Sequence, residues 1–135
     1  MTPDFHLHKA LRIEKSLAKL PPDLFEIRIE AAMLASTHWL NRAYHDLGVN
    51  SVDSDVMHTY MLTVNEFRRL EAANSELITM MAEIEDLRPL YVRGDMPGAI
   101  EAAEYAVTLL GRIRTISENI FLMKAKSSQA ASQSI

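Results

Sequence analysis

Apolar residues recur at helical spacing along most of the chain. In the first such segment, residues 3–19, Ala10, Ile13 and Leu17 lie three or four positions apart. The pair Pro21-Pro22 ends this segment, because proline cannot donate the backbone hydrogen bond that a continuing helix needs. Three further segments of this kind follow, and no stretch has the strict alternation typical of a strand. The pattern predicts an all-α fold.

The second segment, residues 23–48, is apolar around much of its circumference. It begins with Asp23 and Glu26, which can both accept hydrogen bonds from free N–H groups of the first turn, and it ends at Gly48. Its apolar positions form one stripe of Ile27, Ala31 and Leu34, and a second stripe of Ile29, Met33, Leu40 and Leu47. Two stripes predict a central helix that contacts neighbours on two sides.

A long third helix and a fourth helix are predicted in the second half of the chain. Apolar positions alternate at four and three residues from Val56 to Ile84, so a helix is expected from about residue 54 to Arg88, where Pro89 bends or ends it. Its length would be about 50 Å at 1.5 Å per residue. Residues 98–126 carry the most regular apolar stripe and predict the fourth helix.

These elements predict an up-down four-helix bundle with one long third helix, formed by a single domain of residues 1–126. The last residues, 127–135, are small and mostly polar and are expected to form a disordered tail. The third helix should extend beyond the shorter first helix and leave part of its apolar stripe uncovered. A second copy of the chain would cover that stripe, so a homodimer is predicted.

Composition narrows the class of protein. The chain has 135 residues, of which 48% are hydrophobic, as in an ordinary globular domain. It has no cysteine, which excludes disulfides and thiolate metal sites and favours a cytoplasmic location. No apolar run approaches the ~18 residues that a membrane span requires, so no membrane association is expected. The net charge of −4 argues against nucleic acid as a partner.

The first stripe of the second segment becomes polar toward its end. Continuing its spacing beyond Leu34 leads to His38, Asn41 and His45. His38 and His45 are seven residues apart, so they lie within about 20° of each other on one helix face. In one interpretation these residues only hydrogen-bond within a wetter end of the bundle. In a second, they line a pocket for a small ligand together with Arg42.

A divalent metal site is the third interpretation. The second and third helices are predicted to be antiparallel neighbours across a short loop, which would bring His58 near His45. His38, His45, His58 and Glu30 would then offer the nitrogen and oxygen ligands that zinc prefers.

Three other potential ligands are assigned no metal role by the sequence. Asp55 lies three residues before His58, but it is interpreted as a cap of the third helix. His6 and His8 are expected to point to opposite sides of the first segment, which argues against a metal site shared by this pair.

The segment Arg42-Ala-Tyr-His45 loosely resembles the arginine and histidine motif of HEPN-type four-helix proteins, many of which are dimeric ribonucleases. Fewer residues separate the two positions here than is typical of that motif. The resemblance implies a dimeric bundle in which Arg42 and His45 take part in RNA cleavage.

Motifs of the common enzyme classes are absent from the sequence: it has no nucleophile motif, no glycine-rich phosphate loop and no paired-carboxylate pattern. The leading hypothesis is therefore a non-enzymatic protein without a cofactor that works by association, as a homodimer or with another protein. The alternative is a bundle that binds a small ligand or a divalent metal at the residues named above.

Overall fold

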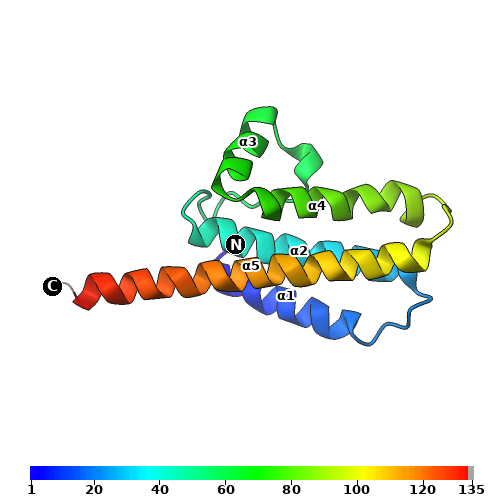
Figure 1. The fold of residues 1–135 in the computed structure, drawn as a ribbon, viewed down its shortest axis with the longest axis horizontal. Coiled ribbons are helices and arrows are strands. Elements are labelled where there is room, and N and C mark those ends of the chain that lie inside the picture. Colours follow the sequence, from blue (N-terminus) through cyan, green and yellow to red (C-terminus); the bar gives the residue numbers. More distant parts are fainter. Residues whose placement is uncertain (134–135) are drawn as a thin grey trace.

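The computed structural model describes residues 1–133, and within this range its regular elements are all helices, joined by loops and without a strand (Figure 1). The all-α prediction is confirmed, although five α-helices are present where four were predicted. They are α1 (Pro3–Leu17), α2 (Phe25–Asp46), α3 (Val64–Ala73), α4 (Ser75–Leu87) and α5 (Ala99–Gln133). Two short elements, the 3₁₀-helix η1 (Thr59–Met61) and the π-helical turn η2 (Arg88–Val92), complete the set.

The helix α2 is central, as predicted. It packs against α5, α1 and α4, and α4 also packs against α5. Figure 1 shows α1, α2, α4 and α5 side by side, with α3 standing apart from them beside one end of α4. Trp39 on α2 is fully buried, and its indole Nε1 donates to the Glu14 carboxylate of α1 at 2.7 Å. The backbone carbonyl of Trp39 accepts from Ser117 of α5 at 2.8 Å, so polar contacts also join these three helices.

The predicted long third helix is not present. Residues 47–63 form a loop with η1 as its only helical element, and the rest of the predicted helix is divided into α3 and α4. The expected overhang of a third helix beyond α1, on which the homodimer prediction was based, is therefore wrong. Only the end of this region follows the prediction, because α4 stops at Leu87 and Pro89 lies in η2.

Local capping groups explain both new boundaries. The side chain of Thr63 accepts from the backbone N–H of Glu66, and the Glu66 carboxylate accepts from the backbone N–H of Thr63, which forms a capping box at the start of α3. Asn74 has an extended backbone, and its side chain accepts from the N–H of Leu77 to start α4. The Asn74 carbonyl accepts from the buried Tyr44 hydroxyl at 2.9 Å instead of from a following helical turn.

The first apolar stripe of α2 does not face the core. Ile27 is 54% exposed and Leu34 is 49% exposed, because the neighbouring helices cover the other sides of α2. In the second stripe, Ile29, Met33 and Leu40 are buried as predicted, whereas Leu47 lies past the end of the helix and is 39% exposed. The first part of this stripe therefore borders a surface, whereas Asn41 and His45 further along it are buried.

The ends of α2 agree with the prediction only in part. The predicted cap at Asp23 is wrong: Leu24 precedes the first residue of α2, and no side chain caps this end. Gly48 has a φ of +73°, the left-handed conformation expected after a helix C-terminus.

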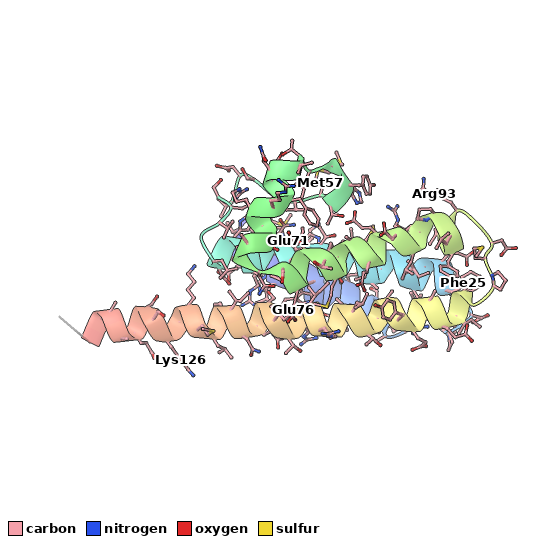
Figure 2. The ribbon with its side chains drawn as sticks, turned by 45° about the horizontal axis from the view of Figure 1, so that its top comes forward. Phe25, Met57, Glu71, Glu76, Arg93 and Lys126 are labelled. Atoms are coloured by element: carbon pink, nitrogen blue, oxygen red, sulfur yellow. The ribbon has the colours of Figure 1, made fainter. Side chains whose placement is uncertain are left out.

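The helix α5 continues through the predicted tail to Gln133, and residues 121–132 are exposed. Lys126 lies on the part of α5 that projects beyond the other helices (Figure 2). Residues 127–133 are thus helical where disorder was expected, and residues 134–135 lie outside the described range. None of the described helices combines the length and the apolar character that crossing a membrane would require.

Candidate metal centre

The loop that follows α2 folds back against the same helix. The Asn41 side chain forms two buried hydrogen bonds with the backbone of Val56: its Nδ2 donates to the carbonyl at 2.8 Å, and its Oδ1 accepts from the N–H at 2.7 Å. This pair of bonds satisfies both backbone hydrogen-bonding groups of Val56. Because Val56 is fixed in this way, the preceding residue, Asp55, is held beside the last turns of α2.

Two histidines and one carboxylate converge where this loop meets α1 and α2. The Nε2 atoms of His6 and His45 lie 3.0 Å and 2.8 Å from the same atom, Oδ1 of Asp55. All three ligand atoms lie within 4.8 Å of one another. Both imidazoles are almost fully buried, whereas the Asp55 side chain is 27% exposed. The cluster therefore has one face toward solvent, on the side of Asp55.

The other nitrogen of each imidazole is already engaged within the protein. Nδ1 of His45 lies 3.0 Å from the carbonyl oxygen of Asn50, and Nδ1 of His6 lies 2.9 Å from Nδ1 of His38. Hydrogen bonds of this kind fix the orientation and tautomer of histidines that bind metals. His38 thus contacts the side of the His6 ring that is remote from Asp55 and does not itself face Asp55.

Each contact between a ring nitrogen and an oxygen of this cluster requires a proton or a cation between the two atoms. The Asn50 carbonyl and the Asp55 carboxylate are both acceptors, so the His45 ring must donate a proton on each side or share a cation with Asp55. His6 must likewise place a proton or a cation between its Nε2 and the same carboxylate oxygen. A metal ion at this point would replace both protons.

Burial and hydrogen bonding change the acidity of these groups. Burial, and after it the neighbouring His6, lower the pKa of His38 to about 4. Burial also lowers the pKa of His6, against the effect of its bond to Asp55. Burial alone would raise the pKa of Asp55, but the hydrogen bonds from His6, from His45 and from the N-terminal ammonium of Met1 outweigh it and lower this pKa below its ordinary value. The site therefore favours neutral His6 and His38 beside an ionised Asp55, the states that bind metals.

A cleft of about 760 Å³ opens beside the cluster. His6, His38 and Asp55 line one part of it, and His58 and Arg88 line another. The charged groups of that second part are paired. His58 Nδ1 lies 3.0 Å from Glu85, and Arg88 donates to Glu30 at 2.6 Å.

The structure brings together only part of the predicted metal site. His45 belongs to the cluster and His38 contacts it through His6, but His58 and Glu30 are bound to Glu85 and Arg88 instead and do not reach it. The reason is the missing long helix: the loop places Asp55, and not His58, opposite His45.

The predicted ligand residues Asn41 and Arg42 also have other roles. Asn41 lines the cleft, but its side-chain amide is hydrogen-bonded to the backbone of Val56. The Arg42 guanidinium is buried 4.4 Å from the centre of the Phe121 ring and 5.8 Å from that of Trp39. Arg42 and His45 thus have different partners, and the two residues of the HEPN-like motif do not converge on a common site.

Sequence reasoning missed His6 and Asp55. His6 is buried and His8 exposed, so the two do point to opposite sides, but this contrast was used only to exclude a pair. The same contrast marks His6 as a histidine that faces the core. A core-facing histidine was the one feature of the sequence that could have indicated this site. Asp55 carried no comparable sign, because its position depends on how the loop folds.

Comparison with protein-family models, with curated proteins and with solved structures finds no match to this chain.

Proposed function

We propose that this protein binds a divalent transition-metal ion through His6, His45 and Asp55. The observation that carries the proposal is the convergence of two buried imidazole nitrogens on a single carboxylate oxygen, at 3.0 Å and 2.8 Å. The remaining ring nitrogens already have partners, so neither imidazole must rotate to bind an ion.

The geometry needs little adjustment to accept an ion. Ligands at 2.0–2.2 Å from a tetrahedral metal lie about 3.3–3.6 Å apart. The two nitrogen–oxygen distances found here are a few tenths of an ångström shorter, and the two Nε2 atoms lie within 4.8 Å of each other. The Asp55 side chain can supply this movement because it is partly exposed, and its other oxygen, Oδ2, lies 3.2 Å from the N-terminal ammonium of Met1. Two histidines and one carboxylate form the donor set of catalytic zinc sites and of non-haem iron(II) sites, both of which leave positions open.

The proposal favours the metal-binding alternative over pure association. Its scaffold would be an up-down four-helix arrangement of α1, α2, α4 and α5, with α1, α2 and the loop each supplying one ligand. The homodimer, the cytoplasmic location and the domain boundary near Lys126 stay predictions, and the metal site depends on none of them.

Metal stoichiometry tests the proposal directly. Full-length protein without an affinity tag would be stripped with a chelator, dialysed and titrated with Zn²⁺, Co²⁺ or, without oxygen, Fe²⁺, and native mass spectrometry would count bound ions. We expect one ion per chain, and a Co²⁺ absorption spectrum typical of nitrogen and oxygen ligands.

Matched variants locate the site. Asp55→Asn and His45→Gln should weaken metal binding by at least about 100-fold, while His58→Gln, at the paired histidine of the same cleft, should leave it unchanged. Circular dichroism would confirm that each variant is folded. Absence of a stoichiometric ion in the wild type, or its retention in folded Asp55→Asn, would refute the proposal.

A further inference from the structure

The cleft beside the metal centre has the dimensions of a small-molecule site. Its volume of about 760 Å³ lies within the range of ~300–1,000 Å³ that is usual for such sites. The α2 residues that line it extend from Met33 to Asn41. At 1.5 Å per residue this is a length of about 12 Å.

One wall of the cleft consists of apolar side chains that the protein leaves uncovered. Leu34 is 49% exposed, Val52 is 40% exposed and Met57 is 67% exposed, and all three line this cleft. Figure 2 shows Met57 in the segment that leads to α3, on the far side of α4 from α5. Because covering apolar surface is favourable, these residues would stabilise an aliphatic group lying along the cleft. Methionine at this position also adapts to groups of different shape.

Most charged groups that line the cleft are paired, including the N-terminal ammonium of Met1, which lies 3.2 Å from Oδ2 of Asp55, whereas Asp53 has no ion-pair partner among the described residues. Arg88 is paired with Glu30 and His58 with Glu85, so that part of the cleft needs no charged ligand. A divalent ion beside the single carboxylate of Asp55 keeps a net positive charge. An anionic oxygen ligand at the open position would neutralise it.

The hydrogen bond between His6 and His38 adds a donor at the same place. When His6 binds the ion through Nε2, its proton lies on Nδ1 and is donated to Nδ1 of His38. The His38 proton must then lie on Nε2. His38 lines the cleft, and its Nε2–H has no acceptor among the described residues, so it can donate to a carboxylate bound at the metal.

We infer that the cleft binds a small aliphatic monocarboxylate. Its carboxylate coordinates the ion held by His6, His45 and Asp55 and accepts from His38, and its aliphatic chain lies against Leu34, Val52 and Met57. This inference rests on the proposed metal function.

Isothermal titration of full-length protein with sodium acetate, butyrate and hexanoate tests the inference, after one equivalent of Zn²⁺ has been confirmed by mass spectrometry. Affinity should increase about two- to fourfold for each added methylene, as expected for partial to full burial of that group. Chelator-treated protein should bind none of the three. Leu34→Ser should weaken hexanoate binding several-fold with little effect on acetate or zinc.

Ile27→Ser is the matched control, because Ile27 is 54% exposed on the same helix but does not line the cleft. It should leave every affinity unchanged. Affinity independent of chain length, or equal loss of hexanoate binding in both variants, would overturn the inference while the metal function stands. Binding that persists in chelator-treated protein would also overturn it. Failure to load zinc would instead refute the proposed function, and the inference with it.

Discussion

Asp55 and Glu85 are both carboxylates that face histidines on the same cleft, yet their hydrogen-bond partners differ. Glu85 is 4% exposed, and besides His58 it accepts from the Thr59 backbone N–H at 3.0 Å and from the Thr59 hydroxyl at 2.6 Å. Asp55 has a more exposed side chain, its Oδ1 faces the ring nitrogens of two histidines, and its Oδ2 accepts from the N-terminal ammonium of Met1 at 3.2 Å.

The difference shows how two similar groups are suited to different tasks. A backbone N–H does not lose its proton near neutral pH, so a metal ion cannot take its place. The donors around Glu85 therefore satisfy its hydrogen bonds and attach η1 to α4. The protons between Asp55 and its imidazoles are exchangeable, and a metal ion can take their place. The identity of the donors, and not the presence of histidine and carboxylate together, distinguishes the candidate metal centre from the structural contact.

The largest expected effect is on stability, at Glu85. Glu85→Ala would leave the buried N–H and hydroxyl of Thr59 without acceptors, and the free energy of unfolding should fall by about 3 kcal/mol. Asp55→Ala should cost clearly less in chelator-treated protein, because Asp55 is partly exposed and water can replace it. Urea unfolding at pH 7 measures both values. Equal losses would remove the distinction between the two carboxylates.

Zinc should stabilise the protein through Asp55 and not through Glu85. At a free concentration of one hundred times Kd, an ion that binds only the folded state adds about 2.7 kcal/mol to the free energy of unfolding. The wild type and Glu85→Gln should show the same increase, measured by urea unfolding with and without zinc. Asp55→Asn should show none. An increase that disappears in Glu85→Gln but persists in Asp55→Asn would show that the ion binds at Glu85 and not at Asp55.

A smaller effect is expected at His38, which positions His6. His38→Leu removes the acceptor at Nδ1 and should weaken zinc binding about tenfold. This is the lower end of the roughly 10- to 100-fold loss of affinity that is usual when a metal-binding histidine loses its hydrogen-bond partner. His38→Gln can restore a hydrogen bond and should recover part of the affinity. Competition with a coloured chelator measures both variants, with His58→Gln as the control. Unchanged affinity in His38→Leu would show that His6 needs no support from His38.

The smallest expected effect is a pH dependence of the metal-free protein. The pKa of His38 is about 4 in the folded state, below its ordinary value of 6.5, because of burial and then of His6, Lys9 and Arg12, with Asp55 opposing them. Between pH 6.5 and 4 the unfolded chain binds a proton that the folded chain does not, so stability falls as the pH decreases and is constant above this window. Urea midpoints at pH 7, 6 and 5 should decrease less in His38→Gln. Parallel decreases in both proteins would assign the effect to other groups.

The sequence by itself determined the helical class and much of the geometry of α2. Apolar spacing places residues on helix faces whatever surrounds the helix, so the core positions Ile29, Met33 and Leu40 were predicted correctly. That His38 and His45 share one face of α2 followed from helical geometry alone, since seven residues make nearly two turns. The turn at Gly48 followed from the conformational freedom of glycine.

Only the tertiary structure decided what those faces meet. An apolar spacing that runs from Val56 to Ile84 cannot reveal that Thr63 and Asn74 cap new helices, because caps act through single hydrogen bonds that the spacing does not record. His6 and Asp55 lie 49 residues apart, and Asp55 reaches His6 from a loop that Asn41 holds through the backbone of Val56 and that the N-terminus of Met1 also contacts. Periodicity specifies the side of a helix on which a residue lies, whereas a metal centre requires atoms from separate segments to converge within a few ångströms. That convergence depends on how the loop packs, and no local pattern encodes it.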